Sequence, residues 1–285
     1  MITFLRRPKL GRGSVRGMTS FLNGIGVPSK GVLHDRQTVP PETSLLVRWG
    51  CVGQSHFEGL TLNPVNSIYR VNDKLGFRIL CRDSDPNIVP FTIVIPQEWN
   101  GMRMIVRPKT HAQGRNLKVI STLEELLQVT NEPAFRSGWY ASELIDKVAE
   151  YRVYVIQGRV ATIAEKTPAD PSAIAWNVAQ GGRFDVLPRG RWPMNVVEVA
   201  VKSWALSGLD FGGVDVIVDR DGKAYQIEIN SAPSLPLLSD GSISYRQKCM
   251  ATVFNYIRQR MDKTVIPIEE YSGWRSVIHP ALMEE

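Results

Sequence analysis

The chain has 285 residues and a formal net charge of +6 at pH 7, with 22% charged and 43% hydrophobic residues. These proportions are those of a soluble globular protein, and no apolar run approaches the roughly 20 residues that a membrane-spanning helix needs. The three cysteines lack CxxC spacing and the start, MITFLRRPKL, lacks an apolar core, which indicates free thiols in a reducing compartment and excludes a zinc framework and a secretory signal.

Basic residues gather near the N-terminus, directly after a short strand predicted over residues 2–5. Together with a sequence pI of about 9.3 they indicate an anionic partner: a nucleotide, an acidic peptide or a nucleic acid. Ser14 predicts the N-cap of a helix that ends at the glycines 24 and 26. No G-x-G-x-x-G motif is present, so no dinucleotide-binding loop is predicted. The cluster is either a solvated surface, which we favour, or a patch for a polyanionic substrate; it comprises Arg6, Arg7, Lys9, Arg12 and Arg16.

The middle of the chain alternates short apolar runs with amphipathic segments. The spacing predicts a buried strand over residues 45–49 and one helix over 66–80, then strands at 91–95 and 104–106 and a helix at 122–129.

A polar loop that contains Gly114 follows the strand at 104–106. Such a loop can cradle phosphates with its backbone N–H groups, although a plain hairpin loop explains the same residues.

In the second half, strands are predicted at 139–145, 150–157 and 160–165. A second glycine-containing turn follows at 177–182. Helices are predicted at 196–206 and 243–261.

Between these two helices, residues 211–233 read as a β-hairpin. Apolar and polar residues alternate with period two on both sides of Asp221-Gly222, which is a strong hairpin signal. If these two residues form the turn, Asp215 lies directly opposite Glu228, and Asn230 follows on the same face. The other face is then valine, isoleucine and tyrosine, suited to a core.

Two like charges directly opposite each other destabilise a hairpin. Either one of the carboxyls has a raised pKa, or a cation lies between them. Magnesium fits the second case, because it takes one or two protein carboxylates and shares its other ligands with water and phosphate oxygens. The alternative is a solvent-facing strand side that carries acids without a function.

The hairpin is similar to the Asp … Glu-x-Asn magnesium signature of the ATP-grasp superfamily, and the order of the parts over roughly residues 45–240 resembles the same superfamily. The sequence most resembles the ligases that add glutamate to a ribosomal protein, and D-alanine–D-alanine ligase more distantly. The resemblance implies an α+β chain with the ATP-grasp fold, in which two α+β subdomains grip ATP. It implies a short N-terminal α/β region at 1–65, a central subdomain at 66–145 and a C-terminal subdomain with the metal site at 146–285.

The resemblance also implies roles for single residues. The metal ligands would be Asp215, Glu228 and Asn230, holding Mg²⁺ or, alternatively, Mn²⁺. The residues that would bind ATP are Lys74, Arg107, Gly114, Glu143, Leu144, Ile145 and Glu150. The residues that would bind the substrate carboxylate and the developing oxyanion, or else be ordinary surface residues, are Arg152, Lys166 and Asn177.

The sequence departs from the family pattern at three positions. Arg107 stands where the family usually has lysine, and Gln180 replaces an arginine of an Asn-x-x-Arg-Gly-Gly motif. Gly213 stands where the dipeptide ligase has a catalytic arginine, so another cation, Arg152 or Lys166, must fill that role.

The function implied is that of an ATP-dependent carboxylate–amine ligase, an enzyme that forms an amide bond through an acyl phosphate and releases ADP and phosphate. Its substrates would be small-molecule or peptide carboxylates and amines, in the cytoplasm of a bacterium or of a phage-infected host, without membrane association and with a dimer as the general default. The alternative is a non-catalytic module that binds nucleotide and holds a nucleic acid or an acidic protein through the basic N-terminus. A phosphotransferase or nucleic-acid ligase of the same fold is a third interpretation.

Overall fold

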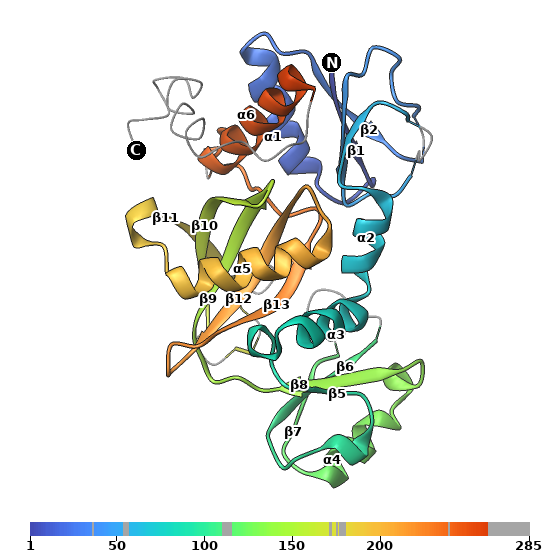
Figure 1. Ribbon diagram of the computed structural model, residues 1–285, viewed down its shortest axis with the longest axis vertical. Coiled ribbons are helices and arrows are strands. Elements are labelled where there is room, and N and C mark those ends of the chain that lie inside the picture. The colour runs from blue at the N-terminus through green and yellow to red at the C-terminus, as the bar shows by residue number, and fades with distance from the viewer. Residues whose placement is uncertain are drawn as a thin grey trace.

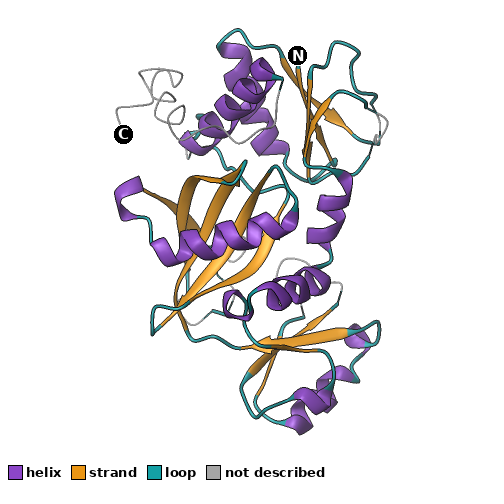
Figure 2. Ribbon diagram, in the orientation of Figure 1, coloured by secondary structure: helices purple, strands orange, loops and turns teal. Residues whose placement is uncertain are grey.

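The computed structural model describes residues 1–35, 37–53, 57–109, 116–170, 173–174, 176, 181–238 and 240–261. Figure 1 shows three β-sheets stacked along the long axis, with helices beside each of them. Each part contains both helices and strands, as Figure 2 shows, so the predicted α+β class is confirmed.

The N-terminal sheet is parallel and has the order β2-β1-β3-β4. The strands are β1 (Ile2–Arg6), β2 (Ser29–Leu33), β3 (Leu45–Trp49) and β4 (Leu60–Leu62). Helix α1 (Arg12–Gly24) and the last described helix, α6 (Tyr245–Arg260), lie side by side next to this sheet (Figure 1).

One apolar core joins these N-terminal elements to the central sheet. The ring of Phe254 on α6 packs edge-on against Phe4 of β1 and Phe211 of the central sheet, with centroids 5.9 and 5.0 Å away. Trp49 stacks on Phe211 at 5.2 Å. The C-terminal helix thus packs between the N-terminal sheet and the central sheet.

Helix α1 begins three residues earlier than predicted, and the proposed N-cap role of Ser14 is wrong. Gly11 occupies the cap in the left-handed conformation, without a side-chain cap. Ser14 is buried inside the helix, where its hydroxyl accepts a hydrogen bond of 2.9 Å from the backbone N–H of Leu235. The serine therefore serves a contact between distant parts of the chain.

Gly11 is expected to tolerate no side chain. An added Cβ would lie 2.2 Å from Cδ1 of Trp49, whereas at Gly26, which has a similar positive φ, nothing lies within 4 Å. Gly11→Ala should therefore lower the free energy of unfolding by about 1–3 kcal/mol more than Gly26→Ala, because both carry the backbone strain but only the first carries the clash. Urea unfolding of both variants measures the difference, and equal losses would contradict it.

The single helix predicted over residues 66–80 is two helices, α2 (Val65–Asn72) and α3 (Lys74–Ser84). Asp73 separates them, and its carboxylate accepts a 3.0 Å hydrogen bond from the N–H of Gly76, which caps α3. Lys74 consequently stands at the first position of a new helix.

The lower sheet is antiparallel, with the order β5-β8-β6-β7, and has its own small core. Its strands are β5 (Thr92–Ile93), β6 (Met104–Pro108), β7 (Lys118–Ile120) and β8 (Trp139–Glu143). Helix α4 (Leu123–Thr130) begins with a capping box formed by Thr122 and Glu125. Short 3-10 helices flank these elements: η1 (Pro86–Ile88), η2 (Pro96–Glu98) and η3 (Pro133–Phe135).

The central sheet has the order β11-β10-β9-β12-β13, and every neighbouring pair is antiparallel. Its elements are β9 (Lys147–Ile156), β10 (Arg159–Thr167), β11 (Arg183–Leu187), η5 (Arg189–Arg191), α5 (Met194–Ser207), β12 (Phe211–Asp219) and β13 (Ala224–Asn230). Helix α5 covers one face of this sheet (Figure 1) in a second apolar core. The strand register places the polar side chains described below on the other face.

Most predicted elements are present, but β2, β4, β7 and β11 lie outside them. The domain boundaries stay a prediction. All three cysteines are free, as expected. None of the described helices combines the length and the hydropathy that crossing a membrane requires.

Candidate functional site

The β12–β13 hairpin places Asp215 directly opposite Glu228, as predicted, and Gly213 opposite Asn230. The length of the turn and the pairing next to it differ from the prediction. The turn has three residues, because the N–H of Asp219 donates to the carbonyl of Lys223 at 3.0 Å. A register shift beyond Asp215 then leaves one extra residue, at position 227, on β13. This bulge compensates for the longer turn and restores the pairing of the two acids.

The bulge also changes which side chains share a face. Ile229 lies opposite Val214 on the apolar face, as predicted. Tyr225 was placed on that face and is not there: it pairs with Ile217, on the face of the acids, and its hydroxyl contacts the carboxylate of Asp219 at 3.1 Å. Ala224 takes its place opposite Val218, and Gln226, 2% exposed, lies opposite Val216 on the apolar side.

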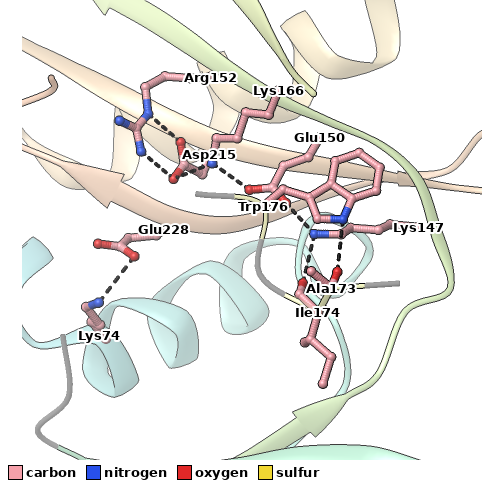
Figure 3. Close-up of polar contacts among 10 residues, drawn as sticks. All are labelled: Lys74, Lys147, Glu150, Arg152, Lys166, Ala173, Ile174, Trp176, Asp215 and Glu228. Atoms are coloured by element: carbon pink, nitrogen blue, oxygen red, sulfur yellow. Dashed lines mark hydrogen bonds and ion pairs between the residues drawn. The ribbon is translucent and has the colours of Figure 1, made fainter. Parts of the chain in front are cut away.

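Asp215 is the centre of a buried network of charges (Figure 3). The guanidinium of Arg152, on β9, binds both carboxylate oxygens at 2.7 Å, and Nζ of Lys166, on β10, lies 3.1 Å from one of them. Burial raises the pKa of Asp215, but the two cations outweigh it, so that the pKa lies well below its usual range. The cation expected near the paired acids is thus supplied by the chain itself.

Lys166 also links Asp215 to Glu150, whose Oε1 is 2.5 Å from the same Nζ. Glu150 makes a second ion pair with Lys147. That lysine lies over the ring of Trp176 at 4.5 Å and donates to the carbonyl of Ile174 at 2.9 Å. Figure 3 shows this group beside the Asp215 network. Lys147 and Trp176 were not predicted as site residues; the only sign of them in the sequence is the closeness of Lys147 to Glu150.

Glu228, the second acid of the pair, faces helix α3. Its carboxylate lies 3.2 Å from Nζ of Lys74 (Figure 3), and both side chains are partly exposed. One helical turn further, Arg78 is 3% exposed and donates to the carbonyl of Ile227, the bulge residue, at 3.0 Å. Burial and then the charge of Arg107 lower the pKa of Arg78 to about 10. Arg78 was missed, since only its four-residue spacing from Lys74 points to it.

Arg107 lies on β6 of the lower sheet, hydrogen-bonded to the hydroxyl of Ser142 and 5.8 Å from the ring centre of Tyr140. Burial lowers the pKa of Arg107. Glu143 ends β8, and residues 144–146 then join the lower sheet to β9. The N–H of Leu144 donates to the carbonyl of Arg103 at 2.9 Å, which fixes the segment to the lower sheet. Glu143, Leu144 and Ile145 thus lie at the junction of the two sheets; their role in binding ATP stays a prediction.

Gly114, Asn177 and Gln180 lie outside the described residues. At Gly213 the structure explains the missing side chain. A Cβ there would lie 2.8 Å from Cβ of Pro233 and 3.5 Å from Cδ of Arg152. Arg152 therefore lies beside the position at which the family pattern has an arginine.

The oxygen donors fit a hard divalent cation. Asp215, Glu228 and Asn230 share one face of the hairpin, and two carboxylates with an amide are the donor type that Mg²⁺ prefers. Within the described ranges, no three His, Cys, Asp or Glu side chains form a metal-binding cluster. The amide of Asn230 would be the third protein donor of such a site, and this ligand set stays a prediction.

No protein-family model matches the sequence. The chain is 23% identical over 160 residues to the D-alanine–D-alanine ligase of Aquifex aeolicus (strain VF5), and it spans about half the length of that relative, 55% of each chain.

Solved structures match over almost the whole chain. One is the ATP-grasp ligase PsnB with a minimal precursor, Mg and ADP: TM-score 0.67, 14% identity, 90% of this chain and 97% of the other. A second is a RiPP-associated ATP-grasp ligase of Chryseobacterium gregarium with ADP and a leader and core peptide. Its TM-score is 0.67 and its sequence identity 14%, over 93% of this chain and 99% of the other. A third is the D-alanine–D-alanine ligase of Bacillus anthracis with ATP. Its TM-score is 0.62 and its sequence identity 13%, over 92% of this chain and 98% of the other. The chain has the ATP-grasp fold.

Proposed function

We propose that this protein is an ATP-dependent carboxylate–amine ligase that forms an amide bond through an acyl phosphate and releases ADP and phosphate. The observation that carries the proposal is the cross-strand pair of Asp215 and Glu228, held among Arg152, Lys166 and Lys74 on an ATP-grasp fold. Here three basic side chains surround two opposed acids, and such an arrangement of fixed charges is suited to phosphoryl transfer.

The site residues divide the work of phosphoryl transfer, in which positioning and electrostatic stabilisation supply most of the catalysis. Glu150 is the candidate for the ribose hydroxyls, and Lys74 and Arg107 are the candidates for the phosphates. Asp215, Glu228 and Asn230 would hold Mg²⁺, which when bound neutralises charge on the transferring phosphoryl group. Mn²⁺ is the alternative ion. Arg152 and Lys166 would stabilise the negative charge that develops on the substrate oxygens.

A peptide is the substrate class that we favour for the carboxylate or the amine. Two of the similar structures contain a precursor, or a leader and core peptide, as bound partner. The net charge of +6 adds a general attraction for acidic peptides.

Exposed basic residues near the N-terminus support a second candidate function, a nucleotide-binding module that holds a nucleic acid or an acidic protein. Arg7, Lys9, Arg12 and Arg16 are all exposed. Binding of this kind would weaken steeply with salt, because released counterions drive it.

The test is ATP turnover by the whole chain with a pool of amino acids, peptides and acidic polypeptides, with and without magnesium. We expect ADP and phosphate only when magnesium and a carboxylate–amine pair are both present. AMP and pyrophosphate would instead indicate adenylyl transfer. Nucleotide binding without any turnover would support the second candidate, and absence of nucleotide binding would refute both.

A further inference from the structure

A buried arginine on α6 has no counter-charge in the part of the chain that the structure describes. Arg246 is 5% exposed, and its Nε has no hydrogen-bond partner. Its Nη1 donates one long hydrogen bond of 3.4 Å to the hydroxyl of Tyr154. No carboxylate within the described ranges forms an ion pair with it. A buried, unpaired guanidinium is costly, so its retention calls for a compensating anion.

Arg246 belongs to a group of cations around one aromatic ring. The centroid of Phe184, on β11, lies 5.1 Å from Cζ of Arg152, 5.6 Å from Nζ of Lys166 and 5.9 Å from Cζ of Arg246. The first two cations are neutralised by Asp215, and Lys166 also by Glu150. Among these three cations, Arg246 is the one that no carboxylate of the described residues neutralises.

The nearest candidate acid, Asp185, does not take the role of a counter-ion. Its carboxylate accepts hydrogen bonds of 2.9 Å from Arg183 and from Thr167, and its side chain is half exposed. Arg246 acts on it only as a more distant charge that helps to lower the pKa of Asp185, after the contact with Arg183 and other nearer influences.

The place of Arg246 along the sheet indicates what the anion is. Alternate residues of β9, namely Glu150, Arg152 and Tyr154, share the face of the network and follow each other at about 6.6 Å per step. Under the proposed function, the nucleotide lies over Glu150 and the reacting oxygens of the substrate lie near Arg152. The next position along this line is Tyr154, with Arg246 above it, on the side of the N-terminal region.

We propose that Arg246 binds a carboxylate group of the substrate and holds the substrate at the phosphate end of the nucleotide site. This inference rests on the proposed function. Arg246 is a binding and positioning residue in it: no covalent bond forms or breaks at the guanidinium, which contributes its charge and charge-assisted hydrogen bonds. The aromatic side chains of Phe184 and Tyr154 lie beside this guanidinium and shield its charge from water, which strengthens its attraction for a carboxylate.

The test compares Arg246→Met with wild type and with Arg258→Met. Arg258 lies on the same helix, and its guanidinium is satisfied by the side chain of Asn255 at 3.0 and 3.1 Å, so that it controls for loss of an arginine from α6. The probe is L-glutamate against chloride at matched ionic strength, with Mg·ADP present and absent, and the readouts are Tm and calorimetric binding.

L-glutamate is expected to raise the Tm of wild type and of Arg258→Met by about 2–4 °C. Arg246→Met should lose this shift, and its Kd for L-glutamate should rise at least about tenfold. Without L-glutamate, its Tm should equal or exceed that of wild type, because an unpaired buried charge is gone; a purely structural arginine would give a lower Tm. Arg246→Lys should keep part of the binding, since lysine keeps the positive charge but lacks the planar guanidinium that donates two parallel hydrogen bonds.

Two results would overturn the inference: an L-glutamate shift of equal size in Arg246→Met, or no shift in wild type. Binding of Mg·ADP is measured on the same samples. If wild type binds Mg·ADP while its response to L-glutamate does not depend on Arg246, the inference fails and the proposed function stands. If wild type does not bind Mg·ADP, the proposed function fails.

Discussion

Asp215→Asn is expected to lower the free energy of unfolding by about 3–5 kcal/mol, the cost of removing one partner of a buried ion pair. The substitution keeps the shape of the side chain but removes the charge that Arg152 and Lys166 share, and both cations are almost wholly buried. ATP turnover should be lost as well, since the same carboxylate is a proposed metal ligand.

Chemical unfolding at neutral pH measures this change, with Asp185→Asn as the matched control. The Asp185 side chain is half exposed, so its replacement should change the free energy by less than about 1 kcal/mol. The pH dependence gives a second check. The pKa of Asp215 is lowered in the folded state, so its contribution is complete above its unfolded value of about 3.9 and is lost as the pH falls below that. Asp215→Asn should therefore differ most from wild type at neutral pH and least in acid; a constant difference would contradict the argument.

Glu228→Gln is expected to lower kcat for ATP turnover by about 10²–10³-fold, the size typical for loss of one group that stabilises transition-state charge. Its effect on stability should be small, below about 1 kcal/mol, because its ion pair with Lys74 is partly exposed. Initial rates of ADP formation at saturating Mg·ATP, together with unfolding curves, separate the two effects.

Glu198→Gln is the control for the loss of a glutamate charge. Glu198 forms an exposed pair with Lys202 on α5, away from the site face of the sheet, and its replacement should leave turnover unchanged. Wild-type rates in Glu228→Gln would refute the proposed metal site. A large loss of stability in that variant would instead show that Glu228 is a structural residue.

Local patterns predicted much of the fold because their signals lie within a few residues. The alternation in the hairpin gave the pairing of Asp215 with Glu228, although the turn length was wrong by one residue and the bulge on β13 was not foreseen. Strands β2 and β4 were missed because they are short and show little alternation of apolar and polar residues. Their extended conformation is stabilised by pairing with β1 and β3 and not by a local sequence pattern.

Long-range contacts account for the other errors. Ser14 looks like an N-cap, but its partner is Leu235, more than two hundred positions away. Asp73 breaks a pattern that is helical on both sides, since a capping carboxylate can start a new helix wherever the fold needs a bend. Arg78 and Arg246 are ordinary helical arginines in sequence, and only packing shows that both are buried.

The ion pairs around Asp215 and Glu228 have a consequence for the order in which ligands bind. Three carboxylates, Asp215, Glu228 and Glu150, face four cations, which leaves this network with a net charge of +1; the cations are Arg152, Lys166, Lys74 and Lys147. Such a site repels a bare divalent ion and attracts a polyanion. Nucleotide should therefore bind before magnesium or together with it, drawing Lys74 away from Glu228 and freeing that carboxylate. Magnesium affinity would then be weak in the absence of nucleotide and would rise with nucleotide concentration, a reciprocal linkage between the two ligands.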